Sequence, residues 1–197
     1  MKARLPILVK ITIAILFLLP LGSVRAGEEP ATGFVGDYLM QLDAVQKQIL
    51  SLENAMPQEK FTWRPSEGVR SVSEVYLHIA FANYLLTKFA GYDPPADVAS
   101  QIDLNYLSKW DASTTDKTAI AERVTKSFDH LRSTVAKISD TDLESKVEFF
   151  GQMLTKRNMM LTALSHLHEH LGQSIAYARM NGVVPPWSAG EQQQGGN

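Results

Sequence analysis

Four long stretches of the chain repeat apolar residues every three or four positions, the spacing of one face of an α-helix. They cover residues 34–56, 71–89, 116–138 and 156–181. Helices of this kind are stable when their apolar faces pack against one another. The sequence therefore predicts an all-α fold, a four-helix bundle that spans residues 34–187.

The ends of these helices carry recognisable signals. Ser71-Val72-Ser73-Glu74 matches the S-x-x-E capping box and opens the second helix. Gly91 closes it, and Asn181-Gly182 ends the last helix. Residues 96–115 form a long connection between the second and third helices. Residues 147–154 predict a small two-stranded excursion around Gly151-Gln152.

The first 26 residues have the three parts of a secretory signal peptide. Basic residues come first, an apolar run covers residues 11–21, and Val24-Arg25-Ala26 places small residues at the −3 and −1 positions of a cleavage site. The apolar run is shorter than the ~20 residues of a membrane span, which is the alternative. We expect cleavage after Ala26, a linker over 27–33 and a disordered tail over 188–197.

Export changes the charge of the chain and restricts its chemistry. The net charge goes from −2 to −6 because four basic residues and no acidic residue leave with the signal. A net acidic chain without a Lys/Arg cluster argues against nucleic acid as a partner. No cysteine is present, so a metal would be held by imidazoles and carboxylates. We expect a periplasmic or secreted protein with no stable membrane insertion after cleavage.

Three histidines are the candidate metal ligands. His166 and His170 are four residues apart in the last helix, so their Cβ atoms lie about 5–6 Å apart on one face. His78 lies among the inward-facing residues of the second helix. Three histidines from two helices, with one coordination position open, are typical of a catalytic metal site. The alternatives are a solvated face for the pair and a hydrogen-bonded core residue for His78.

Other polar residues near these histidines are weaker candidates. Glu74 lies one turn before His78 and is a candidate to orient it or to act on a metal-bound water, although its capping-box role is preferred. Possible pocket groups are Asn83, Tyr84, Gln173 and Tyr177. The two remaining histidines, His130 and His168, are expected on the surface. No catalytic residue beyond these is indicated.

Two segments resemble the DinB-like superfamily, which includes the DinB proteins and the YfiT-type metal-dependent hydrolases. The first contains Trp63-Arg64-Pro65 and runs from Gly68 to Asn83 through His78. The second is H-x-x-x-H-L-G-Q at 166–173, followed by Y-x-R-x-x-G-x-x-P at 177–185. The order and lengths of the helices look similar over residues 34–187.

The resemblance implies an up-down-down-up bundle with a three-histidine site for a divalent metal, often zinc or nickel. The family's ligand positions correspond to His78, His166 and His170. Family members with known activity include transferases and isomerases that use mycothiol or bacillithiol, and dimers are common, so a homodimer is one expected state. Export counts against a thiol-dependent reaction here, because these thiols are chiefly cytosolic.

Two hypotheses follow for the function. The first is a metal-dependent enzyme, a hydrolase or transferase acting on a small molecule that the sequence does not identify. The second is a non-enzymatic bundle that binds a metal or small ligand in a structural or stress-related role. An open, water-exchangeable coordination position favours the first, and a closed site favours the second.

Overall fold

The computed structural model describes residues 32–189, which are mostly helical with one small sheet. The predicted signal peptide and most of the linker and the tail lie outside these residues. The α-helices are α1 (Gly33–Ala55), α2 (Val72–Phe89), α3 (Leu107–Asp111), α4 (Lys117–Val135), α5 (Asp140–Leu143) and α6 (Lys156–Met180). Short 3₁₀ turns are η1 (Gln58–Lys60), η2 (Ala99–Gln101), η3 (Leu104–Tyr106) and η4 (Pro186–Ser188).

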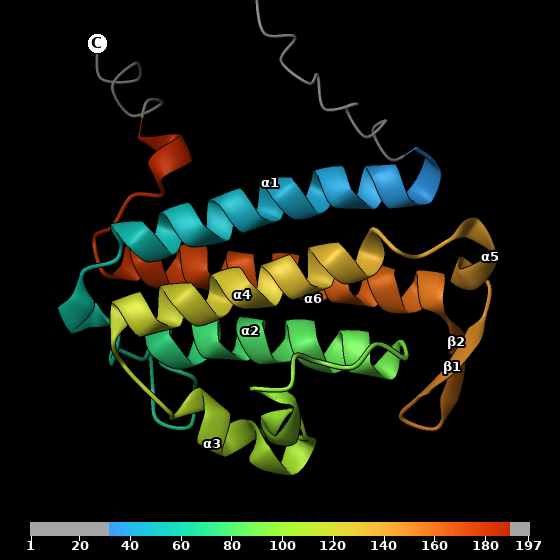
Figure 1. The fold of residues 1–197 in the computed structure, drawn as a ribbon. Coiled ribbons are helices and arrows are strands. Elements are labelled where there is room, and N and C mark those ends of the chain that lie inside the picture. Colours follow the sequence, from blue (N-terminus) through green and yellow to red (C-terminus); the bar gives the residue numbers. More distant parts are fainter. Residues whose placement is uncertain (1–31, 190–197) are drawn as a thin grey trace, which may run out of the picture. The chain divides into compact units, whose positions relative to one another are not determined.

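Four long helices lie side by side and form the body of the molecule (Figure 1). α1 packs against α4 and α6, and α2 packs against the same two helices. Figure 1 shows that α1 and α6 run in one direction, whereas α2 and α4 run in the other. The core lies between them and contains the apolar positions that the helical spacing predicted, such as Leu42, Ile79, Phe128 and Leu167.

The capping box at the start of α2 is present as predicted. The Ser71 hydroxyl accepts a hydrogen bond from the Glu74 backbone N–H, and the Glu74 carboxylate accepts one from the Ser71 N–H. Gly91 follows the helix with φ +88°, a left-handed conformation that costs glycine little. Both ends of the helix that carries His78 are therefore set by local sequence.

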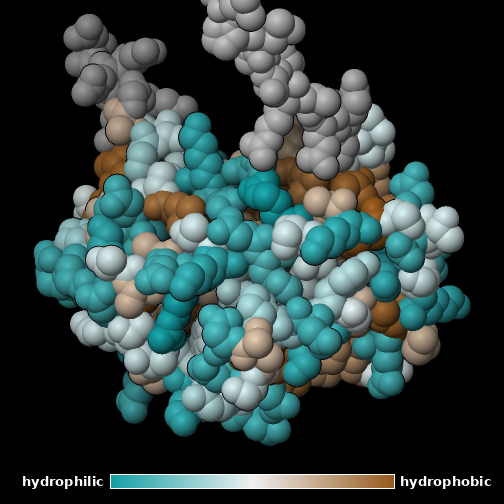
Figure 2. Space-filling model, viewed as in Figure 1, coloured by the Kyte–Doolittle hydropathy of each residue, from teal (hydrophilic) through white to brown (hydrophobic). Residues whose placement is uncertain are grey.

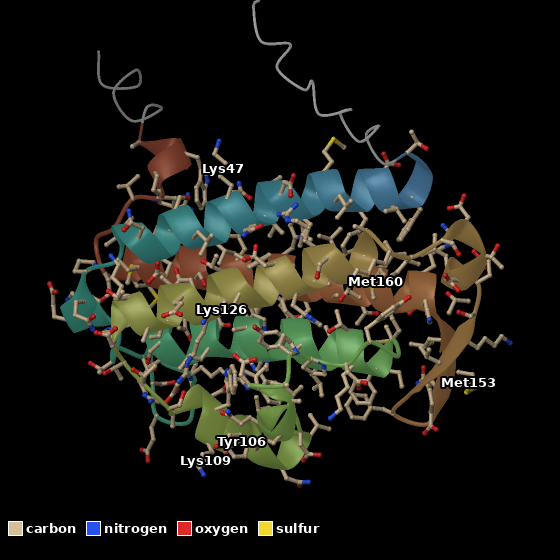
Figure 3. The ribbon with its side chains drawn as sticks, viewed as in Figure 1. Lys47, Tyr106, Lys109, Lys126, Met153 and Met160 are labelled. Carbon is tan, nitrogen blue, oxygen red and sulfur yellow. The ribbon has the colours of Figure 1, made fainter. Side chains whose placement is uncertain are left out.

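The long connection after α2 contains η2, η3 and α3, where the sequence predicted no regular element. Trp110 is buried and its indole N–H donates to the Leu77 carbonyl at 2.9 Å. The Lys88 ammonium donates to the Ile102 carbonyl at 2.8 Å. These bonds hold the connection against α2, while Tyr106 and Lys109 lie on its outer side (Figure 3).

The predicted excursion is an antiparallel hairpin of β1 (Lys146–Phe149) and β2 (Gln152–Thr155). Phe149 pairs with Gln152, so the turn residues are Phe150 and Gly151, one position earlier than predicted. Both have positive φ, +49° and +80°, as a tight two-residue hairpin turn requires. Phe150 adopts this conformation without being glycine and packs edge-on against Phe149.

Hydrophilic residues cover most of the face seen in Figure 2, with small hydrophobic areas between them. Among residues 32–189, no helix combines the length and apolarity that a membrane crossing needs.

A carboxyl group near the end of α1 is buried in the core. Glu53, near the end of α1, is 2% exposed, and its Oε1 has no hydrogen-bond partner among the described residues. Burial raises the pKa of Glu53 from its usual value near 4.5 to about 7, although the Lys117 charge opposes this shift. The folded protein thus favours the neutral carboxyl group.

We predict that Glu53→Gln removes a pH dependence of stability. Between pH 4.5 and 7 the folded chain keeps a proton that the unfolded chain has released, so the free energy of unfolding falls as pH rises through this window. The neutral amide has no such loss, and the variant should be more stable than the wild type at pH 8 by about 1–3 kcal/mol. Urea unfolding at pH 5 and pH 8 measures this.

Glu59→Gln is the control, because Glu59 is exposed and lies six residues away in η1. An equal change in unfolding free energy between pH 5 and 8 for wild type and Glu53→Gln would contradict the buried neutral carboxyl.

Candidate metal centre

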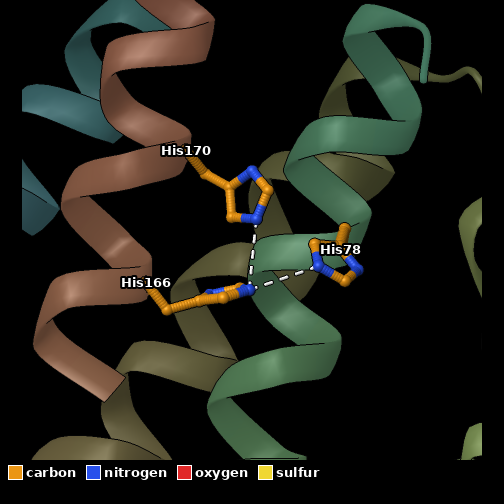
Figure 4. A group of neighbouring side chains, drawn as sticks. All are labelled: His78, His166 and His170. Atoms are coloured by element: carbon orange, nitrogen blue, oxygen red, sulfur yellow. Dashed lines mark hydrogen bonds between the residues drawn. The ribbon is translucent and has the colours of Figure 1, made fainter. Parts of the chain in front are cut away.

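The structure brings the three predicted histidines together. His78 comes from α2, and His166 and His170 come from adjacent turns of α6. The ring nitrogens of the three histidines point toward one another (Figure 4). Their potential ligand atoms all lie within 4.8 Å of one another. The Nε2 atom of His166 is 3.3 Å from that of His78 and 3.1 Å from that of His170.

A chain of hydrogen bonds fixes the orientation and tautomer of His170. The Tyr177 hydroxyl donates to the Arg70 carbonyl at 3.1 Å, so it accepts from the Gln173 Nε2 at 3.0 Å. The Gln173 Oε1 then accepts from His170 Nδ1 at 2.8 Å. Because the Arg70 carbonyl can only accept, the direction of every donation in this series is fixed. The proton of His170 is therefore on Nδ1, and its lone pair is on Nε2, which faces the other two rings.

The three imidazoles are held in the neutral form. Burial lowers the pKa of His78 to about 3 and that of His166 to about 4, with smaller contributions from neighbouring charges that include Arg70. Burial also lowers the pKa of His170, although the bond to Gln173 opposes it. Neutral imidazole is the form that binds metals, so protons do not compete for these nitrogens near pH 7.

This donor set fits a divalent ion. Zinc bound to histidine at about 2.0–2.1 Å in tetrahedral geometry separates the nitrogens by about 3.3–3.4 Å. The observed separations of 3.3 and 3.1 Å are close to that value. One Nε2 atom cannot satisfy two neighbours by hydrogen bonding, since it carries either one proton or one lone pair. A shared cation would resolve this crowding at His166.

Two residues beside the histidines were missed by the sequence interpretation. Asp111, at the end of α3, places Oδ2 3.9 Å from His78 Nδ1, and Arg70 Nε donates to the same oxygen at 2.8 Å. His78 Nδ1 and Asp111 Oδ1 are buried without a hydrogen-bond partner among the described residues. Asp111 belongs to a connection with no helical spacing, so no sequence signal placed it here; Arg70 directly precedes the capping box and was passed over.

Of the other polar residues that the sequence suggested, some contact the histidine site and some lie away from it. Gln173 and Tyr177 belong to the hydrogen-bonded chain, and the Glu74 carboxylate is occupied by Arg64 and the Ser71 N–H. Asn83 and Tyr84 are not site groups: Asn83 donates to Ser127 of α4, and the Tyr84 ring packs against Trp110.

The remaining two histidines also differ from each other. His168 is exposed as expected. His130 is less exposed than expected: it lines a surface hollow, but it is half-buried, and its Nε2 lies 3.0 Å from the Thr87 hydroxyl of α2.

A polar groove of about 700 Å³ lies beside the histidines. Its wall includes the His170 partner Gln173, the His78 neighbour Asp111, and Arg70 and Glu74. The connection after α2 supplies the opposite side through Leu104, Leu107 and Ser108. The groove therefore reaches a residue that contacts His170 and a residue that lies beside His78.

A family model described as the DinB superfamily matches residues 41–174, which include all three histidines. The chain belongs to the DinB superfamily. No curated protein matches the chain. The DinB assignment and the triad agree with the resemblance of the two sequence segments, although the middle of the chain carries no motif.

Solved structures share the fold of this DinB superfamily member. A DinB-like protein from Bacillus cereus aligns with TM-score 0.65 and 18% identity, covering 76% of this chain and 93% of its own. A DinB-like protein from Bacillus subtilis aligns with TM-score 0.57 and 17% identity, covering 74% and 92%. A mycothiol-dependent maleylpyruvate isomerase aligns with TM-score 0.56 and 14% identity, covering 70% of this chain and 59% of that one.

We predict that Gln173→Leu weakens metal binding without unfolding the protein. The substitution removes the acceptor for His170 Nδ1 and with it the fixed tautomer. Loss of such a partner typically lowers metal affinity about 10–100-fold. Competition with a chromogenic chelator measures the dissociation constant for zinc.

His168→Ala is the matched control, because this exposed histidine lies on the same helix and bonds only to the Leu164 carbonyl. Equal zinc affinities for wild type and Gln173→Leu would show that the hydrogen bonds from Gln173 and Tyr177 do not orient His170 for metal binding.

Proposed function

We propose that this protein is a metal-dependent enzyme, a hydrolase or transferase, whose ion is held by His78, His166 and His170. The observation that carries the proposal is the convergence of three neutral imidazoles, two of which contact or lie beside residues of a polar groove, Gln173 and Asp111. Zinc or nickel is the expected ion because the family resemblance implies them, whereas imidazole ligands by themselves also suit copper and iron. The bound ion would supply Lewis-acid polarisation of a substrate oxygen and lower the pKa of a bound water toward ~7.

The residues around the triad have separate roles in this proposal. Gln173 and Tyr177 hold His170 in the ligating tautomer. Asp111 is the nearest carboxylate to His78 Nδ1, at 3.9 Å, and is placed to orient that ring. Glu74 serves mainly to cap α2, since both of its oxygens are engaged.

The number of candidate ligands supports an enzyme rather than a structural metal protein. Within residues 32–189, the group of potential ligand side chains at this site contains the three histidines alone. A fourth position is then left for water or substrate, which is the catalytic rather than the structural pattern. The fold shared with an isomerase also supports an enzyme, whereas the predicted export leaves the thiol-dependent reaction the weaker choice.

The alternative is a non-enzymatic protein that binds a metal or small ligand. It requires a coordination position that does not exchange with water. In that case metal removal would lower stability without exposing a reactive site. The absorption spectrum of the cobalt-loaded protein, with and without added azide, separates the two: a shift on adding azide requires an open position.

Further features of the chain fit the same proposal. The helix directions support an up-down-down-up four-helix bundle over residues 34–187. We infer a periplasmic or secreted protein without nucleic-acid partners or stable membrane insertion, and a homodimer is consistent with the family. The substrate is a small molecule that enters the groove.

We predict that His170→Ala and the double variant His78→Ala/His170→Ala lose the metal. Each loses one or two of three ligands, and two imidazoles or fewer hold zinc far more weakly. Elemental analysis of untagged protein should give close to one ion per chain for the wild type and His168→Ala, and almost none for the two variants. Retained stoichiometry in His170→Ala would refute the ligand assignment.

We predict that the exported protein begins at Gly27. Cleavage after Ala26 removes the basic and apolar segments together. Intact mass spectrometry of protein recovered from the periplasm or medium checks the cleavage point. An intact precursor in the membrane fraction would favour a retained anchor instead.

A further inference from the structure

Arg70 is a charged side chain on the groove whose hydrogen-bonding capacity is only partly used. Its Nε donates to Asp111 Oδ2 at 2.8 Å, and the side chain is 35% exposed. Among residues 32–189, its two Nη atoms make no hydrogen bond, although the Nη atoms of Arg64 are both engaged. The free end of the guanidinium therefore remains available to a ligand in the groove.

The geometry of this end suits a carboxylate. The Asp111 contact fixes the plane of the guanidinium, and the unused N–H groups form a planar fork that matches two carboxylate oxygens. Glu74, the other acid on the groove wall besides Asp111, is already held by Arg64 and by the Ser71 N–H. Neither acid on the groove wall is hydrogen-bonded to the Nη atoms.

Arg70 is also close to the histidine triad. Its backbone carbonyl ends the hydrogen-bonded chain that runs from His170 through Gln173 and Tyr177. Its Nε and His78 Nδ1 both approach the same oxygen of Asp111. A ligand held by the Nη atoms would thus lie in the groove whose wall contains Asp111 and Gln173, the neighbours of His78 and His170.

A second, mainly apolar cleft shares Leu104 with the groove. It has a volume of about 510 Å³, and its wall consists of Leu85, Phe89, Ile102 and Leu104 together with the polar residues Lys88, Asp103 and Asn105. Glu74, His78 and Leu85 lie on one stripe of α2, because 4 and 7 residues are close to whole turns. Along α2, the turn that carries His78 lies between Glu74, which lines the polar groove, and Leu85, which lines the cleft. The Lys88 ammonium beside the cleft is already bonded to the Ile102 carbonyl.

We propose that the groove binds a small organic carboxylate, with its carboxylate on the Nη atoms of Arg70 and its apolar body toward the Leu104 cleft. This deepens the proposed function and rests on it, since the bound molecule would be the substrate presented to the metal. Arg70 selects a negatively charged ligand, and Leu104 limits the size and polarity of the part of the ligand that is not the carboxylate.

Benzoate and its neutral counterpart benzamide test the charge requirement. Both are titrated by NMR into the zinc-loaded and the metal-free protein. Because a hydrogen bond between charged groups is worth about 1.5–3 kcal/mol, benzoate should bind about tenfold or more tighter than benzamide in both forms. Equal affinity for the two molecules, or no benzoate binding by the wild type, would overturn the proposal.

Two substitutions at the ion pair should act in opposite directions. Arg70→Gln keeps a donor for Asp111 but removes the charge, and benzoate affinity should fall about tenfold or more. Asp111→Asn leaves the Arg70 charge unneutralised, and benzoate affinity should rise. Arg157→Gln is the matched control, because Arg157 has similar exposure and is paired with Glu144 away from the groove. A purely structural role of Arg70 predicts losses in both site variants, and that outcome would refute carboxylate binding.

The apolar half of the proposal is tested by comparing benzoate with acetate. Benzoate should bind at least about fivefold tighter because its ring buries apolar surface. Leu104→Ser, at a side chain that is 46% exposed, should reduce this ratio and leave acetate affinity unchanged. An unaltered ratio would remove the cleft from the proposal.

The design separates failure of this inference from failure of the metal assignment. If the wild type bound no zinc, the titrations of the metal-free protein would still decide whether Arg70 binds carboxylates. If zinc bound but Arg70→Gln kept wild-type benzoate affinity, the metal site would stand and the carboxylate site would fall.

Discussion

The packing of α2 on three sides is the constraint on which the rest of the structure depends. α2 lies against α4, α6 and α3, and thirteen of its eighteen residues are buried. Any polar group on such a helix needs a partner, because burial without one is costly. Asn83 finds Ser127 and Thr87 finds two carbonyls of its own helix. The Nε2 atom of His78 lies 3.3 Å from that of His166 in α6, whereas His78 Nδ1 and the Tyr76 hydroxyl have no partner among residues 32–189.

This burial also determines the chemical state of the triad. Imidazoles that lose contact with water resist protonation, so the site is built from neutral nitrogens. Helix packing alone brings the rings together but does not choose their tautomers. That choice comes at His170 from a carbonyl oxygen of the loop before α2, which acts through Tyr177 and Gln173. The main chain of one segment thereby sets the proton position on a side chain from a helix far along the sequence.

Much of the fold could be predicted because its determinants are local. Helical spacing located α1, α2, α4 and α6, and Ser71, Glu74 and Gly91 marked the ends of α2. The three histidines could be grouped because the i, i+4 pair and the inward position of His78 both follow from helical period. Asp111 could not be placed the same way. Its position depends on Trp110 docking onto the Leu77 carbonyl, a long-range contact in a segment without periodicity.

The difference between local and long-range determinants also explains the predictions that were wrong. Asn83 and Tyr84 lie on α2 close to His78 in sequence, but their neighbours are Ser127 and Trp110 rather than the triad. His130 looked exposed beside Asp129, yet it packs on the Tyr84 ring. Which neighbour covers a given helical face depends on the arrangement of all four long helices. A single sequence shows that a face is apolar and does not show what lies on it.

The distance along the chain between the histidines has a consequence for folding. His78 and His166 are 88 residues apart, and the chain has no cysteine with which to join distant segments. An ion shared by the two helices would join these distant segments in the folded state alone, and its binding free energy would add to the stability of the fold. The stability of the folded protein would then depend on the supply of that metal.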